Sequence, residues 1–381
     1  MGAYAGVDAH RQMNFDAVRN PVYKQAIDAL VGPDSVVLDL GAGLGMLGFL
    51  AARAGARKVY MVDPEPVIEV TRKIAAANGL DNVECIRARA EELELPEPVD
   101  LILSVFTGNF LLTEDLLPAL FHARDRLLRP NGQLVPDRAR MVAAPVSLPD
   151  YYQANIANWC LPEAEAHGVE SYSIDYEAVR RYAANSLFYD SATHFKPRLL
   201  AEPAELVEMD FMTATTAACD CAATVAASAS DLCHGWLGWF DMRLGEQWLS
   251  TSPEAKRTHW RQVFLPLEQP IALEVGQILE FRLKRKEFGE WSWITKTGGN
   301  AQRQSTFMSE PLTPDILRRK SETHKPTLND RGRAIQHVLS RLDGTATIAS
   351  VADELMERFA RLFISRDDAL RFVRNLANKN T

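Results

Sequence analysis

The stretch SVVLDLGAGLGMLGFLAARAGA, residues 35–56, decides the fold that we expect for this chain. A short apolar run leads into three glycines at alternate positions, Gly41, Gly43 and Gly45, and apolar residues with helical spacing follow. Glycines at such a place let the backbone turn sharply and approach a ligand, while the next helix offers its N-terminal amides. The stretch therefore predicts a strand, a ligand-binding loop and a helix.

A second apolar run, KVYMVD at residues 58–63, ends in an acid eighteen residues after Gly45 (63 − 45). An aspartate at this place can accept hydrogen bonds from ribose hydroxyls, although Asp63 followed by Pro64 also fits a helix cap. The glycine spacing is GxGxG, one residue short of the dinucleotide fingerprint GxGxxG. The loop and the acid together favour a nucleoside ligand.

Strand-like and helical segments continue to alternate up to about residue 136. VDLILSVF (99–106) predicts a strand, DLLPALFHARDRLL (115–128) a helix, and RPNGQLVP (129–136) a turn into a further strand. Upstream, residues 13–30 have helical spacing, and Pro21 implies either a break in the helix or a fresh helix start. Strands that alternate with helices indicate a parallel α/β sheet.

The character of the sequence changes twice after this region. Residues 200–290 alternate in a way typical of antiparallel strands, residues 150–190 are partly helical, and GGNAQRQSTFMSEPLTPD (298–315) is predicted to be a polar linker. Two amphipathic helices follow, around an Asp343–Gly344 turn. We therefore predict three domains, at residues 1–137, 138–310 and 311–381.

Composition restricts the class of partner. The chain has 381 residues and a net charge of −8, which argues against a large nucleic-acid interface and is compatible with a basic peptide or a small molecule. It has neither a signal-peptide layout nor an apolar run near the roughly 20 residues that span a bilayer, so we expect a cytoplasmic protein without a membrane partner. No CxxC pair occurs and no metal site is expected; the cysteines are Cys85, Cys160, Cys219, Cys221 and Cys233.

Five segments in order resemble the protein arginine methyltransferases, a family of class I S-adenosylmethionine-dependent methyltransferases. They are residues 10–27, 36–63, 78–104, 110–141 and 250–281, the last with its Thr-His-Trp run at 258–260. The likeness covers about residues 4–290 and is poor at 150–230. It implies a Rossmann-like domain, then a β-barrel domain, and a homodimer formed through an arm at about 155–195. Outside the resemblance, the remaining residues are predicted to form a small helical or winged-helix-like domain.

The resemblance implies S-adenosylmethionine as the cofactor. By position, Arg19 would hold its methionine carboxylate, Asp63 its ribose, and Glu91 its adenine amino group, with backbone contact from Ala90. Glu91 alone would also fit a solvated carboxylate at a helix start. The full set implied for the cofactor is Arg19, Asp39, Gly41, Gly43, Gly45, Asp63, Ala90 and Glu91.

The resemblance also implies the catalytic groups and the substrate pocket. A lone histidine such as His259 is ordinarily a buried structural residue, but the family's Thr-His-Trp loop projects into the methyl-transfer site. His259 would pair with Asp16 to relay a proton, and Glu114 would bind the acceptor. The implied pocket residues are Tyr4, Met13, Val105 and Trp260, and Met13 is equally compatible with the core.

One position departs from the family pattern. The family holds the substrate guanidinium between two carboxylates nine residues apart, because that group is always charged and donates paired hydrogen bonds. Here Glu114 is present, but the position nine residues earlier (114 − 9) is Val105. Three interpretations remain open: arginine methylation with help from another acid such as Asp115, methylation of a less basic acceptor, or binding without turnover.

We therefore predict methyl transfer from S-adenosylmethionine to a peptide or protein, most simply on nitrogen. The alternatives are an N- or O-methyltransferase for a small metabolite, and a catalytically inactive protein that binds cofactor and peptide. Residues 326–381 weakly resemble modules that hold peptides in modified-peptide biosynthesis, with Val351, Leu355 and Phe359 on one helix face. A helical cap packed on the barrel explains that pattern as well.

Overall fold

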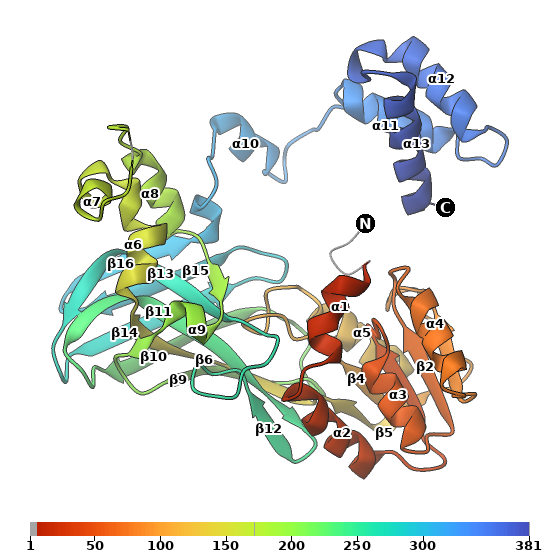
Figure 1. Cartoon of the computed structure of the whole chain (residues 1–381), viewed down its shortest axis with the longest axis horizontal. Coiled ribbons are helices and arrows are strands. Elements are labelled where there is room, and N and C mark those ends of the chain that lie inside the picture. Colours follow the sequence, from red (N-terminus) through yellow and green to blue (C-terminus); the bar gives the residue numbers. More distant parts are fainter. Residues whose placement is uncertain (1–5, 171, 381) are drawn as a thin grey trace. The chain divides into compact units, whose positions relative to one another are not determined.

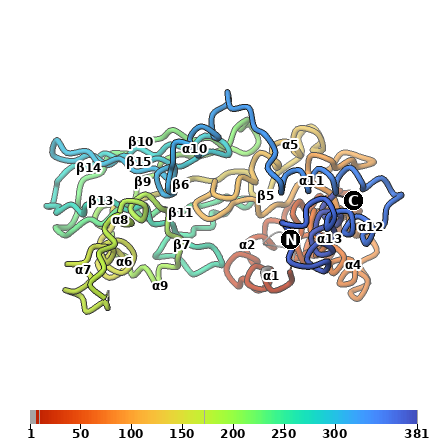
Figure 2. The backbone as a smooth tube through the Cα atoms, turned by 90° about the horizontal axis from the view of Figure 1, so that it is seen from above, coloured from red at the N-terminus to blue at the C-terminus, as the bar shows by residue number. Residues whose placement is uncertain are grey.

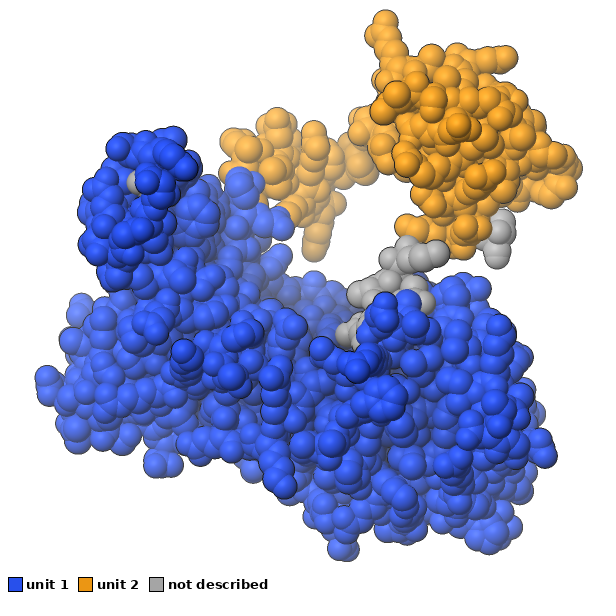
Figure 3. All heavy atoms as spheres, in the orientation of Figure 1, with its two compact units in different colours: residues 1–311 blue, residues 312–381 orange. Residues whose placement is uncertain are grey.

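The structure, a computed structural model, describes residues 6–170 and 172–380. They belong to two compact units, residues 1–311 and residues 312–381 (Figure 3). The predicted pocket residue Tyr4 lies outside the described residues. Within them, no helix has both the length and the apolar character that crossing a membrane requires.

The first half of unit 1 is a five-stranded parallel sheet in the order β3-β2-β1-β4-β5 (Figure 1). All five residues of β1 are buried, as expected for a central strand covered on both faces. The strands are β1 (Val36–Leu40), β2 (Lys58–Val62), β3 (Val83–Ile86), β4 (Val99–Ser104) and β5 (Leu128–Val135). The helices are α1 (Val7–Asn14), α2 (Arg19–Leu30), α3 (Met46–Arg53), α4 (Ile68–Ala77) and α5 (Leu117–Leu127). The predicted parallel α/β fold is confirmed.

Of the two alternatives for Pro21, a break or a fresh helix start, the structure has the fresh start. The chain is interrupted between Asn14 and Arg19, and Pro21 lies in the first turn of α2. A proline is tolerated there because the amide groups of the first turn have no intrahelical acceptor. Pro21 therefore starts a helix instead of ending one.

The second half of unit 1 consists of two antiparallel sheets. One has the order β7-β13-β11-β6-β8, with β12 on β11 and β9 on β6, and the other has the order β10-β14-β15-β16. The strands are β6 (Arg138–Ser147), β7 (Phe188–Asp190), β8 (Arg198–Leu199), β9 (Ala204–Asp210), β10 (Cys219–Ala226), β11 (Asp231–Leu244), β12 (Gln247–Ser250), β13 (Gln262–Leu273), β14 (Ile278–Arg285), β15 (Trp291–Thr297) and β16 (Asn300–Ser305). Trp236 of β11 stacks on Phe281 of β14 with ring centroids 4.2 Å apart, so the two sheets share a core.

Part of the predicted polar linker is a strand. Residues 300–305 form β16, which pairs with β15 in register from Thr297–Asn300 to Ser292–Ser305. An edge strand needs only one buried face, so a run of Asn, Gln, Arg and Ser can occupy it, with Gln304 as its buried residue. The β-rich half of unit 1 therefore extends further along the chain than its composition suggested.

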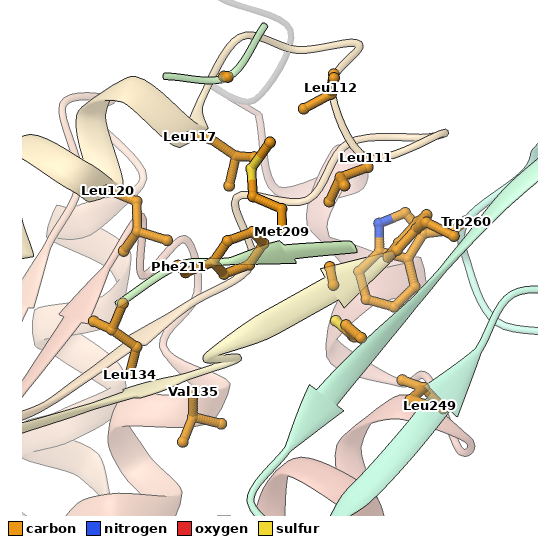
Figure 4. Close-up of a cluster of buried hydrophobic side chains, with 14 of the residues drawn as sticks. Leu111, Leu112, Leu117, Leu120, Leu134, Val135, Met209, Phe211, Leu249 and Trp260 are labelled. Carbon is orange, nitrogen blue, oxygen red and sulfur yellow. The ribbon is translucent and has the colours of Figure 1, made fainter. Parts of the chain in front are cut away.

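The parallel sheet and the β-rich half share one apolar core. Figure 4 shows side chains from the loop after β4, from α5 and from β5 meeting Met209 and Phe211 at the end of β9, with Trp260 close by. All of the labelled residues belong to a single buried cluster. Because close-packed side chains resist displacement, the loops that join the two halves are held in place by the packing of both halves.

Short helices between β6 and β9 extend away from the sheets (Figures 1 and 2). They are α6 (Pro149–Asn155), the 3₁₀ helix η1 (Ala157–Trp159), α7 (Leu161–Ala166), α8 (Glu177–Ala184) and α9 (Ala192–Phe195). The mixed character predicted for residues 150–190 agrees with this arrangement.

Unit 2 is helical, and its described residues include no strand. Its helices are α10 (Pro314–Arg319), α11 (Asp330–Ser340), α12 (Ile348–Arg358) and α13 (Arg366–Asn380). Val351 and Leu355 of α12 are buried in a core of their own with Ala334 and Val338 of α11. Thr347 caps α12 through a reciprocal capping box with Ser350, which satisfies two backbone amides at its start.

Candidate active site

A cavity of about 550 Å³ opens at the carboxyl ends of the parallel strands. The strand order reverses between β1 and β4, which is where open α/β sheets bind ligands. The volume is within the range of small-molecule sites. Its lining includes 24 residues, among them the predicted site residues Met13, Arg19, Asp39, Gly41, Gly43, Asp63, Val105, Glu114, His259 and Trp260.

The glycine loop after β1 has the geometry that its sequence predicted. Gly41, Gly43 and Gly45 all have positive φ values, of 74°, 53° and 89°. A Cβ atom on Gly43 would lie 2.6 Å from the ring of His10, and one on Gly41 would lie 2.4 Å from that of Phe106. Only glycine allows this backbone and this close approach. Gly45 caps α3 and does not itself line the cavity.

Two buried carboxylates lie at the ends of β1 and β2. Asp63 accepts hydrogen bonds from the amides of Gly43 and Glu65, both at 2.9 Å, and burial raises its pKa. Asp39 accepts from the amide of Gly48 in α3 at 2.7 Å, and burial raises its pKa to about 7. Asp39 thus ties β1 to α3, Asp63 follows β2, and both carboxylates line the cavity.

Arg19 is the buried cation of the cavity, with 2 % of its surface exposed. Its Nη2 donates to the carbonyl of Met13 at 2.7 Å and its Nε donates to Asn20 at 2.9 Å. Neither partner is charged, so part of the arginine's positive charge remains for an anionic group in the cavity. A buried positive charge of this kind is what binding of the cofactor's methionine carboxylate, the role predicted for Arg19, would require.

Asp16 and His259 form a hydrogen-bonded pair across 243 residues of sequence. Asp16 Oδ2 accepts from the backbone amide of His259 at 2.8 Å and lies 2.9 Å from its Nδ1. Burial alone would raise the pKa of Asp16, but hydrogen bonds from His259, Arg19 and Val18 hold it at about 2. Burial lowers the pKa of His259 in spite of Asp16, so the imidazole is neutral near pH 7.

The depressed pKa of Asp16 predicts an acid-dependent loss of stability. Because the folded-state pKa lies below the unfolded one, this stabilisation is present above about pH 4 and is lost as the pH falls towards 2. Replacement by asparagine (Asp16→Asn) should therefore cost about 2 kcal/mol near neutral pH. Denaturant unfolding of both proteins measures the difference, which should shrink by about 1 kcal/mol between about pH 5 and about pH 3. A difference independent of pH would contradict the assignment.

The other end of the cavity lies between the two halves of unit 1. Val105 and Glu114 border it from the loop after β4, Tyr189 borders it from β7, and Trp260 borders it from the segment before β13. Trp260 Nε1 donates to the carbonyl of Thr107 at 2.8 Å, and its ring lies 4.1 Å from that of His259. Glu114 is thus the one acid of the family's pair that this loop supplies.

Asp115 does not supply the second carboxylate that arginine methylation would need beside Glu114. Both of its carboxylate oxygens accept from the guanidinium of Arg285, at 2.8 and 2.7 Å. Asp115 is also absent from the cavity lining. A carboxylate already held by a bidentate arginine has little capacity left for a second guanidinium.

Some predicted residues lie outside the cavity lining. Ala90 is buried and Glu91 is exposed in the loop after β3, and their cofactor contacts stay a prediction. Residues that the sequence did not point to also line it, notably His10, Phe106, Tyr189 and Arg261. His10 is the first residue of segment 10–27, so the resemblance could have pointed to it, whereas Tyr189 lies where the resemblance is poor. Within the described residues, no group of three or more potential ligands is arranged for a metal ion.

Family models match both halves of unit 1. A methyltransferase domain matches residues 37–132, and an arginine methyltransferase oligomerization subdomain matches residues 137–291. Together they cover the parallel sheet and most of the β-rich half.

Individual relatives agree with these matches. The histone-arginine methyltransferase CARMER of Drosophila persimilis is 32 % identical over 292 residues, 74 % of this chain and 54 % of the relative. Protein arginine N-methyltransferase 1 of Schizosaccharomyces pombe is 30 % identical over 289 residues, 73 % of this chain and 81 % of the relative. The chain thus spans about half the length of several curated relatives that it matches.

Solved structures of similar architecture belong to the same family. The PRMT1 enzyme–prozyme complex of Trypanosoma brucei matches with a TM-score of 0.71 and 28 % identity, over 80 % of this chain and 99 % of that chain. Arabidopsis thaliana protein arginine methyltransferase 10 matches with a TM-score of 0.67 and 26 % identity, over the same shares. Sequence, fold and site geometry agree, and the chain belongs to the protein arginine methyltransferase family.

Proposed function

We propose that this chain transfers a methyl group from S-adenosylmethionine to a nitrogen atom of a peptide or protein side chain. The observation that carries the proposal is a single cavity, at the reversal of strand order, in which Arg19 and Asp63 face the space shared with Glu114 and His259. The methyltransferase names of the relatives support it, as does the S-adenosylhomocysteine named for the Trypanosoma complex.

The residues present fit such a cofactor. The glycine loop allows close backbone approach, Asp63 offers a carboxylate to ribose hydroxyls, and Arg19 offers a buried cation to a carboxylate. When bound, the cofactor supplies an electrophilic methyl group on its sulfonium. In this proposal residues 1–137 hold the cofactor and residues 138–310 complete the acceptor site.

Cofactor binding tests the first half of the proposal. Titration calorimetry with S-adenosylhomocysteine should show binding to the wild type and a dissociation constant raised about 10- to 100-fold in Asp63→Asn, since a hydrogen bond to a charged group is lost. Asp220→Asn is the matched control, because Asp220 forms an exposed ion pair with Arg282 outside the cavity. Absence of binding to the wild type would refute the proposal.

The protein groups at the acceptor end then have distinct tasks. Glu114 would accept an N–H of the acceptor and orient its nitrogen, and the apolar surfaces of Val105 and Trp260 would exclude water. Asp16 occupies Nδ1 of His259, so Nε2 is the ring nitrogen that can take the released proton. The lowered pKa of His259 keeps it neutral, and therefore able to act as a base, near pH 7.

The names of the relatives point to arginine as the acceptor, whereas Val105 favours a less basic nitrogen. With Val105 in place, Glu114 is the only acid of this loop that lines the cavity, and one acid suffices for a less basic nitrogen such as an imidazole or an amide. A small metabolite is the further alternative, and modification of a peptide but not of free metabolites would exclude it. Cofactor binding without methyl consumption would instead indicate an interaction protein.

We also propose a homodimer assembled through the subdomain at residues 137–291. The segment between β6 and β9 that projects from the sheets carries large exposed apolar side chains, a feature typical of interaction surfaces. They are Trp159, Val169, Tyr172, Ile174 and Tyr176. Light scattering of the full chain should give twice the mass of one chain, and a single-chain mass at micromolar concentration would overturn this proposal. Cytoplasmic localisation and the role of unit 2 stay predictions.

A further inference from the structure

The loop of residues 105–116, between β4 and α5, carries Glu114 and is tied to the β-rich half of unit 1. Three of the contacts that make this connection are Trp260 Nε1 to the carbonyl of Thr107, the amide of Arg261 to Asn109 Oδ1 at 2.7 Å, and Arg285 to Asp115. The first two hold the beginning of the loop. The third holds the residue directly after Glu114, so it has the most direct control of that carboxylate.

The Arg285–Asp115 contact is a bidentate ion pair. Nη1 and Nη2 of Arg285, the last residue of β14, donate to the two oxygens of Asp115 at 2.8 and 2.7 Å. The amide of Phe288 adds a third hydrogen bond to Asp115 at 3.1 Å. A paired fork of this kind fixes the orientation of both groups as well as their distance.

Burial makes this pair unlike the surface ion pairs of the molecule. The side chain of Arg285 is 5 % exposed, and its guanidinium carbon lies 5.2 Å from the ring centre of Trp291. That ring stacks on Phe110, which belongs to the same loop, at 5.4 Å. Since Asp115 is the carboxylate that neutralises this buried cation, removing it would leave an uncompensated charge.

The backbone at Asp115 needs such support. Its φ is 53°, in the left-handed region, where aspartate is tolerated better than most residues but still at a cost. This turn follows Glu114 directly and precedes α5, so it sets the direction in which Glu114 leaves the chain. The Cγ atom of Glu114 also lies 2.9 Å from where a Cβ on Gly108 would be, so its stem crosses the loop closely.

We propose that the Arg285–Asp115 ion pair is a positioning device that holds Glu114 at the acceptor end of the cavity. Neither member lines the cavity, so both act through the loop and not by touching the substrate. The inference depends on the proposed role of Glu114 as the acceptor ligand. Tyr189, which does line the cavity, supports the proximity: burial raises its pKa, with Arg285 opposing and Glu114 adding to that effect.

Loop mobility can be measured without any turnover. Hydrogen exchange of wild type, Arg285→Met and Asp115→Asn, each saturated with S-adenosylhomocysteine, should show residues 108–116 exchanging about tenfold faster in both variants. Asparagine retains the tolerance for positive φ, so Asp115→Asn carries the test if Arg285→Met does not fold. The control is Arg282→Met on β14, the strand of Arg285, which breaks an exposed ion pair with Asp220 of β10.

The second measurement is kcat/KM for methyl transfer, which would not change if the ion pair were purely structural. With an arginine-rich peptide, kcat/KM should fall about 10²-fold in either variant while cofactor affinity stays near that of Arg282→Met. Because Asp115→Asn leaves the buried charge of Arg285 uncompensated, its melting temperature should also fall, and turnover is compared well below it. The double variant should be no worse than the poorer single one, and Arg285→Lys should be intermediate. Unchanged loop exchange, or a kcat/KM equal to that of the control, would overturn the proposal. If no protein methylates the peptide, the proposed function is what has failed, and loop exchange still decides the positioning.

Discussion

Replacing Val105 with glutamate is expected to raise kcat/KM for methylation of an arginine-rich peptide about 10- to 100-fold. The arginine guanidinium is charged, and one added hydrogen bond to a charged group contributes about 1.5–3 kcal/mol. Val105 and Glu114 border the same cavity, so the added carboxylate would face the guanidinium that Glu114 is proposed to bind. Steady-state methylation, with the product located on arginine by fragment mass spectra, measures the effect.

Val105→Gln is the matched control for that experiment. It has nearly the size of glutamate and can accept a hydrogen bond, but it carries no charge. We expect it to gain much less than Val105→Glu. Equal activity of the two variants would mean that a second charge is not what this site needs for arginine.

The Glu114→Gln variant is expected to lose methyl transfer by about 10²-fold, the usual cost of removing one preorganised electrostatic contact from a reacting centre. Cofactor affinity should change by less than about twofold, because Glu114 lies at the acceptor end and Asp63 at the other. The loss should therefore appear in kcat or in the KM of the peptide.

Glu97→Gln controls for the loss of a carboxylate elsewhere. Glu97 forms a surface ion pair with Arg57 and does not line the cavity. This variant should retain wild-type turnover. If Glu114→Gln matched it, Glu114 would not be the acceptor ligand.

Local sequence patterns were sufficient to predict the parallel sheet and the cofactor end of the site. The glycine loop, the strand before it and the acid after the next strand are close in sequence, so their geometry follows from chain stiffness and strand–helix alternation. Asp63 and Gly43, for example, are twenty residues apart and make a direct hydrogen bond. The sequence did not decide between a break and a fresh start at Pro21, since the position of a proline within a helix determines whether it breaks or begins the helix.

The acceptor end could not be predicted in this way. Its contacts join residues far apart in sequence: 243 positions between Asp16 and His259, and 170 between Asp115 and Arg285. The resemblance anticipated the first pair, but no local pattern distinguishes Arg285 from the exposed Arg282 on the same strand. Likewise, the polar composition of residues 300–305 did not predict the edge strand β16, because that strand forms by pairing with β15 and not from the preferences of its own residues.

The central claim is that this cavity binds S-adenosylmethionine and passes its methyl group to a peptide nitrogen at Glu114. The most direct test is mass spectrometry of arginine-rich peptides after incubation with methyl-deuterated S-adenosylmethionine, using wild type, Val105→Glu and Glu114→Gln side by side. Our account predicts labelled methyl groups on a side-chain nitrogen, increased on arginine by Val105→Glu and nearly abolished by Glu114→Gln. Unlabelled peptide with both wild type and Val105→Glu, in proteins that bind the cofactor, would contradict it.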